Sequence, residues 1–77
     1  MAITSPEIKA LLDSEMPDAS VAVQGADGKY QVEIVCGSFV GLNRVKRQQA
    51  VYRILNPHIS SGAIHAVSMI LKTPTEV

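Results

Sequence analysis

Apolar residues recur at helical spacing near the start of the chain, over residues 5–16. One face of this segment collects the apolar side chains Ile8, Leu11, Leu12 and Met16. Ser5-Pro6 is typical of a helix start, with Ser5 as the N-cap and proline at the first helical position. Pro17 biases the residue before it away from helical angles, so we expect the helix to end at about Met16.

Two strand-like runs follow, residues 20–24 and 30–36, with a turn between them. The second run alternates, and its apolar face consists of Tyr30, Val32, Ile34 and Cys36. The intervening Asp27-Gly28 pair is suited to the positive φ angles of a tight hairpin turn. We therefore expect an antiparallel hairpin.

Helical spacing returns over residues 43–55. The face expected to be buried carries Val45, Gln48, Val51, Tyr52 and Leu55. Asn56-Pro57 is expected to end this helix and to begin a short helical turn at 58–61, which Gly62 closes. The sequence thus predicts a long helix followed by a separate short one.

The last apolar run, residues 64–71, has the length of a strand, and residues 72–77 form a polar tail with no expected packing. The order helix, strand, strand, helix, short helix, strand predicts an α+β fold. Its small three-stranded sheet would have the helices packed on one face. A chain of 77 residues is long enough for one domain, residues 1–77.

Composition narrows the class of protein: 47% of residues are hydrophobic and 18% are charged, as in ordinary globular domains. The single cysteine, Cys36, cannot form an internal disulfide, and no signal-peptide pattern starts the chain. No run approaches the roughly 20 apolar residues that cross a bilayer. We expect a cytoplasmic protein that does not engage membranes.

Charge is divided unevenly between the two halves of a chain whose formal net charge is zero. Residues 1–33 carry a net −4 and residues 34–77 a net +4. Four of the basic residues fall within ten positions: Arg44, Lys46, Arg47 and Arg53. Such a run is either a surface that attracts a polyanion or simply a solvated helix face, and the charges alone favour the latter.

Catalytic chemistry is not indicated, because the chain contains no phosphate-binding glycine loop, nucleophile elbow or zinc-protease motif. We expect no enzyme activity. One cysteine and two histidines, His58 and His65, are too few for an isolated metal site, although one of them could join a site that a partner completes. Cys36 is interpreted as a small buried apolar group. No cofactor is expected in the isolated chain.

Three groups of residues together resemble a known family. They are an F-x-G and R-x-x-R-x-x-x-V-Y pattern within residues 39–52, an I-H-A motif at 64–66, and Thr73-Pro74. In this combination the chain is similar to the BolA family, and most similar to its acid-stress branch, IbaG. The resemblance implies a fold like that of class II KH domains.

The resemblance also implies a function. Family members bind monothiol glutaredoxins and share a two-iron two-sulfur cluster, to which the glutaredoxin contributes a cysteine and glutathione. The histidine of I-H-A, here His65, would be the ligand from this chain. Other members act as DNA-binding regulators of stress genes, which here would use Arg44, Lys46, Arg47 and Arg53. The alternatives are thus an adaptor in iron–sulfur, redox or stress regulation, a transcription regulator that binds DNA weakly, and a simple protein-interaction module.

Two departures from the family pattern bear on these alternatives. Lys29 stands in the hairpin loop where close relatives place a histidine ligand, and a protonated lysine has no lone pair for iron. The GxxG loop with which KH domains hold nucleic acid is absent. Both cluster retention and DNA binding are therefore expected to be weak. We expect a monomer, with a homodimer as the alternative.

Overall fold

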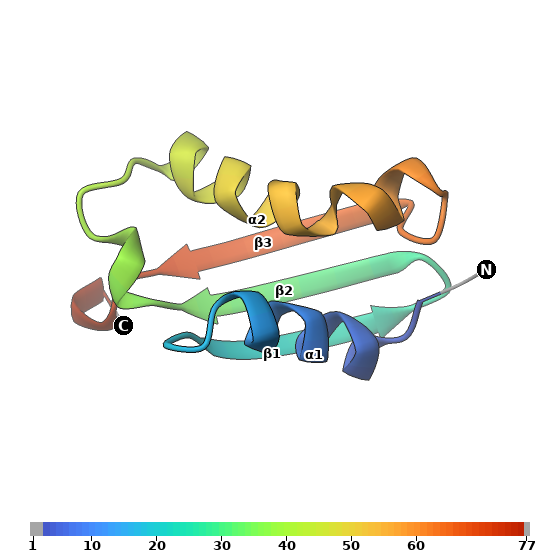
Figure 1. The fold of residues 1–77 in the computed structure, drawn as a ribbon, viewed down its shortest axis with the longest axis horizontal. Coiled ribbons are helices and arrows are strands. Elements are labelled where there is room, and N and C mark those ends of the chain that lie inside the picture. The colour runs from blue at the N-terminus through green and yellow to red at the C-terminus, as the bar shows by residue number, and fades with distance from the viewer. Residues whose placement is uncertain (1–2, 77) are drawn as a thin grey trace.

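Three strands form one mixed sheet, and both helices lie on the same face of it (Figure 1). The computed structural model describes residues 3–76. The elements in chain order are α1 (Ser5–Glu15), β1 (Ser20–Ala26), β2 (Lys29–Val35), α2 (Arg44–Ser60) and β3 (Ala66–Lys72), with short 3-10 turns at Gly37–Phe39 and Pro74–Glu76. β2 is central, antiparallel to β1 and parallel to β3. The predicted α+β fold class is confirmed.

The cap of helix α1 is Thr4 rather than the expected Ser5. The Thr4 hydroxyl accepts from the Glu7 N–H at 3.2 Å, and the Glu7 carboxylate accepts from the Thr4 N–H at 3.1 Å. This reciprocal capping box satisfies two amides that a helix end leaves free. Ser5 instead donates its hydroxyl to the Gly25 carbonyl at 2.7 Å, which ties α1 to β1. The helix ends before Met16, as predicted.

The predicted hairpin is confirmed, and its strands extend up to the turn. Asp27 and Gly28 have φ angles of 56° and 83°, so both occupy the left-handed region that this turn requires. Ala26 pairs with Lys29 directly beside them. The turn therefore fixes the register of β1 and β2.

Helix α2 does not end at Pro57, so the predicted break and separate short helix are wrong. Asn43 caps the helix by accepting from the Lys46 N–H at 2.9 Å, and the helix continues to Ser60. Proline has a helical φ and removes only one hydrogen bond, here near the helix end. Leu55 before it is fully buried and Ile59 after it is packed against the core, so burial on both sides offsets that loss.

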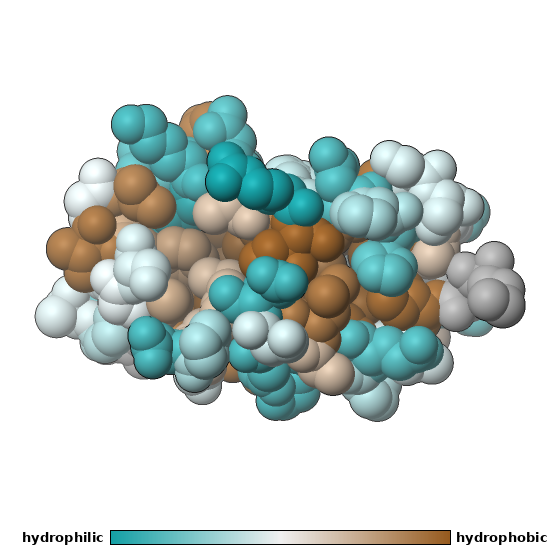
Figure 2. All heavy atoms as spheres, in the orientation of Figure 1, coloured by the Kyte–Doolittle hydropathy of each residue, from teal (hydrophilic) through white to brown (hydrophobic). Residues whose placement is uncertain are grey.

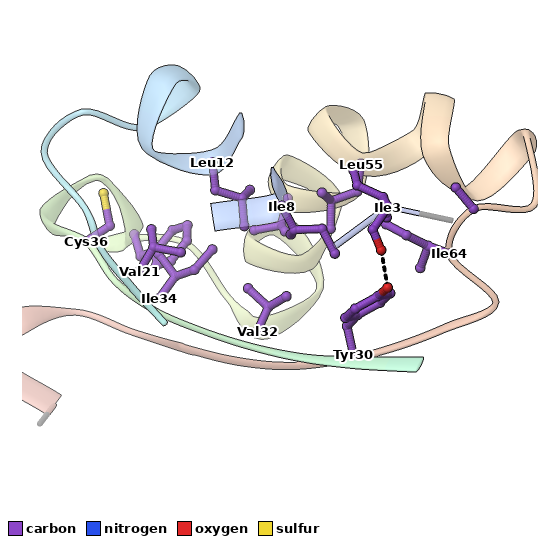
Figure 3. Close-up of a cluster of buried hydrophobic side chains, with 13 residues drawn as sticks. Ile3, Ile8, Leu12, Val21, Tyr30, Val32, Ile34, Cys36, Leu55 and Ile64 are labelled. Atoms are coloured by element: carbon purple, nitrogen blue, oxygen red, sulfur yellow. Dashed lines mark hydrogen bonds between the residues drawn. The ribbon is translucent and has the colours of Figure 1, made fainter. Parts of the chain in front are cut away.

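The core lies between the two helices and the sheet face beneath them (Figure 3). Its largest fully buried side chains are Ile8, Leu12, Val32, Ile34, Cys36, Phe39, Val51 and Leu55. The burial of Cys36 is as expected. Val45 and Tyr52, expected in this core, are instead 59% and 39% exposed. They lie on a flank of α2, because its buried face is centred on Val51 and Leu55.

The polar C-terminal tail is packed, contrary to expectation. Thr73 is buried, and its N–H donates to the Glu76 carboxylate at 2.7 Å. The same carboxylate forms an ion pair with Arg47 of α2, also at 2.7 Å. A short polar segment is thus held by one acid that has two partners.

Neither helix among residues 3–76 is long and apolar enough to cross a bilayer.

The ion pair between Glu76 and Arg47 is expected to make the free energy of unfolding depend on pH. The hydrogen bond from Arg47, aided by the Thr73 N–H, lowers the pKa of Glu76 from 4.5 to about 2. Because the folded-state pKa is lowered, the stabilisation is complete above about pH 4.5 and is lost as the pH falls towards 2.

We expect wild type to lose more stability than Glu76→Gln between pH 4.5 and 2, and the two to converge near pH 2. Urea unfolding midpoints of the two proteins across this pH range would measure the difference. Parallel curves for the two proteins would show that the contact does not depend on the charge of Glu76.

Candidate functional site

His65 lies immediately before β3, against the tip of the β1–β2 hairpin. Its N–H donates to the Gly28 carbonyl at 2.6 Å, and the N–H of Ala66 donates to the same oxygen at 3.0 Å. These two bonds start the parallel pairing of β3 with β2. The backbone of His65 is thus fixed at the point where the third strand joins the hairpin.

The imidazole ring of His65 lies over Gly28. A Cβ atom at Gly28 would come within 2.6 Å of the His65 Cδ2 atom, closer than such contacts occur. Gly28 is buried although it belongs to a turn, whereas His65 is exposed. Glycine is therefore required here both for its φ of 83° and for the space that the ring occupies. The turn supports one side of a ring that remains open to a partner.

A neutral imidazole can donate a nitrogen lone pair to a metal. Lys29, expected in the hairpin loop as the replacement of the second ligand, is instead the first residue of β2, because the two-residue turn is complete at Gly28. It pairs with Ala66 and so lies next to His65. No group of three or more His, Cys, Asp or Glu side chains that could hold a metal occurs within residues 3–76. The residues present thus fit one ligand of a shared cluster, and a partner would have to supply the others.

The other two candidate ligands do not join His65. Cys36 follows the far end of β2, about 23 Å along the strand from Lys29, and is only 1% exposed. It is therefore not a candidate for the missing ligand. His58 is half-buried in the last turn of α2, where its carbonyl accepts from the Ile64 N–H at 3.1 Å. A histidine in a turn begun by Pro57 is expected to be solvated, and His58 is only partly so.

The four basic residues of α2 do not form one uniform surface. Arg44, Lys46 and Arg53 are exposed, but only 14% of the Arg47 side chain is exposed. Arg53 shares a hollow of about 330 Å³ between the two helices with two acids, Glu15 and Asp18. Figure 2 shows apolar surface along this line between the helices. An anion would therefore meet mixed charge near Arg53.

Arg47 is held by contacts within the chain. Its Nε donates to the Leu42 carbonyl at 2.9 Å, and its Nη1 donates to the Leu71 carbonyl at 3.2 Å. Both terminal nitrogens also bond the Glu76 carboxylate, and the guanidinium lies 5.8 Å from the Phe39 ring centre. Most of its donors are thus used to connect α2, β3 and the tail. The position of Arg47 beside the apolar face of the helix allows either a DNA contact or a packing role, and these contacts show a packing role.

The two candidate sites lie at opposite ends of the molecule. His65 is near the end of α2, whereas Arg44 and Lys46 are in its first turn. Seventeen helical residues span about 25 Å, most of the long axis of 36 Å. The structure therefore does not bring His65 and the basic residues together.

Comparison with known proteins gives consistent results. A family model described as BolA, "BolA-like protein", matches residues 3–76. A protein of the rpoN-murA intergenic region of Acinetobacter guillouiae is 43% identical over 96% of this chain and 89% of its own length. The acid stress protein IbaG of Escherichia coli is 40% identical over 91% of this chain and 83% of its own.

Solved structures show the same likeness. BolA1 from Arabidopsis thaliana superposes with a TM-score of 0.84 at 28% identity and covers 100% of this chain and 99% of its own. The BolA domain of SufE1 from the same plant superposes with a TM-score of 0.85 at 28% identity, over 99% of this chain and 100% of its own. The likeness thus extends over the whole described fold.

Proposed function

The chain belongs to the BolA-like family, and on that basis we propose that it is a non-enzymatic adaptor that binds a monothiol glutaredoxin and shares a two-iron two-sulfur cluster with it. The observation that carries this proposal is the exposed imidazole of His65, whose backbone is fixed on the hairpin turn. The adaptor would work in cytoplasmic iron–sulfur, redox or stress regulation. The relative named IbaG is itself described as an acid stress protein.

The chemistry of the donors suits this division of roles. The cluster, when bound, supplies the redox-active iron, and thiolate ligands for it would come from the glutaredoxin cysteine and glutathione. This chain would add one nitrogen donor, His65, held in place by Gly28. With this single donor the chain could not retain a cluster alone, so cluster binding would depend on the ligands of the partner.

Titration of the chain into a cluster-loaded monothiol glutaredoxin with glutathione tests the proposal. Absorption and circular dichroism should change and then saturate as a mixed complex forms. A Cys36→Ser variant is the matched control and should give the same curve, because Cys36 is buried at the other end of β2. Unchanged spectra, or loss of the cluster without a complex, would refute the adaptor function.

We expect the mixed cluster to be labile, because Lys29, the first residue of β2 and a neighbour of His65, has no lone pair to donate when protonated. We expect Lys29→His to lengthen the lifetime of the cluster by about tenfold, equivalent to ~1.4 kcal/mol. Lifetimes would be measured as the decay of visible absorption after addition of an iron chelator. Lys72→His, at the other end of β3, should have no effect. An equal gain in both variants would contradict the placement of the loop at the cluster.

A second candidate function, weak DNA binding, is supported by the exposure of Arg44, Lys46 and Arg53. Three cations predict a non-specific dissociation constant of about 10⁻⁴–10⁻⁶ M and a slope of log affinity against log salt of about −3. The double variant Lys46→Glu/Arg53→Glu should abolish binding in an anisotropy assay. Lys9→Glu/Lys29→Glu, with the same change of charge elsewhere, should retain it. If the first double variant binds DNA normally but loses the glutaredoxin, this helix face binds protein instead.

A further inference from the structure

Strand β3 forms one edge of the sheet, so one side of its backbone has no strand partner. The Lys72 carbonyl accepts from the Cys36 N–H at 2.9 Å, which shows that the Lys72 peptide faces β2. Because peptide groups alternate along a strand, those of Val67, Met69 and Leu71 face outward. The bond from Arg47 to the Leu71 carbonyl on that side agrees with this assignment. Met69 is then the outward-facing residue in the middle of the strand.

A groove runs along this outer edge, between the second half of β3 and the first half of α2. It has a volume of about 770 Å³, and its lining includes Leu42, Arg44, Arg47, Gln48, Met69 and Leu71. Figure 1 shows why it is there: the end of α2 overlies the start of β3, whereas the start of α2 stands outward from the end of β3. The space beside β3 is therefore partly covered by the helix.

The residues that line the groove carry an excess of positive charge, which favours an acidic ligand. Arg44, Arg47 and Lys72 line the groove and are opposed by one acid, Glu76, although the chain as a whole has no net charge. The outward peptide groups of Val67 and Met69 and the Leu71 N–H can form hydrogen bonds with an added strand, while the Leu71 carbonyl already accepts from Arg47. We propose that this groove binds an extended acidic segment of a partner protein, which adds to β3 as a fourth strand.

The charged residues of the groove disfavour two other occupants. A second copy of this chain would present the same excess of basic residues at its own β3 edge, so its charge is not complementary to that of the groove. Of the three cations that line the groove, Arg47 is only 14% exposed and is bonded to Leu71 and Glu76, which leaves Arg44 and Lys72 as the only two for the phosphates of duplex DNA. An extended peptide needs only the edge and the covered space beside it. The groove is also at the other end of β3 from His65, so this contact is independent of the proposed cluster.

The probe is an eight-residue synthetic peptide of alternating glutamate and valine, capped at both ends and titrated into the isotopically labelled chain. We expect amide exchange at Met69 to slow by about tenfold or more on saturation, because its N–H gains a partner. The same peptide with alternate backbone nitrogens methylated cannot complete the ladder and should bind at least about tenfold more weakly. Arg44→Glu should weaken binding by a similar factor, whereas Lys46→Glu, outside the groove lining, is the matched control and should not.

Four results would overturn the proposal. Equal binding of the methylated peptide would exclude strand addition, and equal weakening by Arg44→Glu and Lys46→Glu would exclude the groove as the site. A 12-base-pair DNA duplex that displaces the peptide, and whose binding is weakened by Arg44→Glu and not by Lys46→Glu, would identify the groove as a nucleic-acid site. Self-association of the chain through β3, seen by sedimentation with loss of peptide binding, would identify a second copy as the occupant. The assay contains no glutaredoxin, so its failure leaves the adaptor function untouched.

Discussion

Replacing His65 with alanine is expected to eliminate the spectrum of the mixed cluster with a glutaredoxin and to leave only that of the glutaredoxin itself. The imidazole of His65 can donate a nitrogen lone pair from beside the hairpin tip, whereas a protonated lysine such as its neighbour Lys29 cannot. Absorption and circular dichroism at matched protein concentrations would measure the loss. The side chain is exposed, so the unfolding midpoint of the chain should change little.

His58→Ala is the matched control for this variant. His58 lies in the last turn of α2, and the contacts seen there are made by its backbone carbonyl. The mixed-cluster spectrum should therefore survive its replacement. If His58→Ala removes the spectrum and His65→Ala does not, the assignment of the ligand is wrong.

Gly28→Ala is expected to disturb the position of the His65 ring while leaving His65 itself in the chain. Alanine at a φ of 83° costs roughly 1–2 kcal/mol, and its Cβ would meet the His65 ring at 2.6 Å. The ring must move, so we expect the lifetime of the mixed cluster to fall by about tenfold or more. Chelator challenge would measure the lifetime, and urea unfolding would measure the stability.

Gly62→Ala separates the two effects of that substitution. Gly62 has a φ of 84°, nearly that of Gly28, but a Cβ there would meet no atom within 4 Å. Both variants should lose a similar amount of stability from backbone strain, and only Gly28→Ala should shorten the lifetime of the cluster. Equal lifetimes in the two variants would show that the contact between ring and turn does not position His65.

Local signals in the sequence were sufficient for most of the fold. The Asp27-Gly28 turn has the positive φ angles that its residue types predict, and α1 ends before Met16 as expected. The predicted end of the helix at Pro57 is wrong, because the local backbone cost of proline is offset by the tertiary burial of Leu55, which the sequence does not show. Tyr52 was placed in the core because the helical period fixes a face only to within a neighbouring residue.

The candidate site was only partly predictable. His65 was identified by a motif, but its contact with Gly28 depends on the parallel pairing of β3 with β2, which joins residues 37 positions apart. Arg47 was counted among the basic residues because a sequence shows charge and not hydrogen bonds. Its partners Leu71 and Glu76 lie more than 20 residues away, and they became visible only in the folded chain.

Pulsed electron paramagnetic resonance of the reduced mixed cluster would show whether a histidine of this chain is bound to its iron. Only this chain would be labelled with ¹⁵N in its histidines, and the glutaredoxin and glutathione would be unlabelled. We expect a strong ¹⁵N coupling that persists in His58→Ala and disappears in His65→Ala. A mixed cluster with no ¹⁵N coupling from this chain would contradict the assignment of His65 as the ligand.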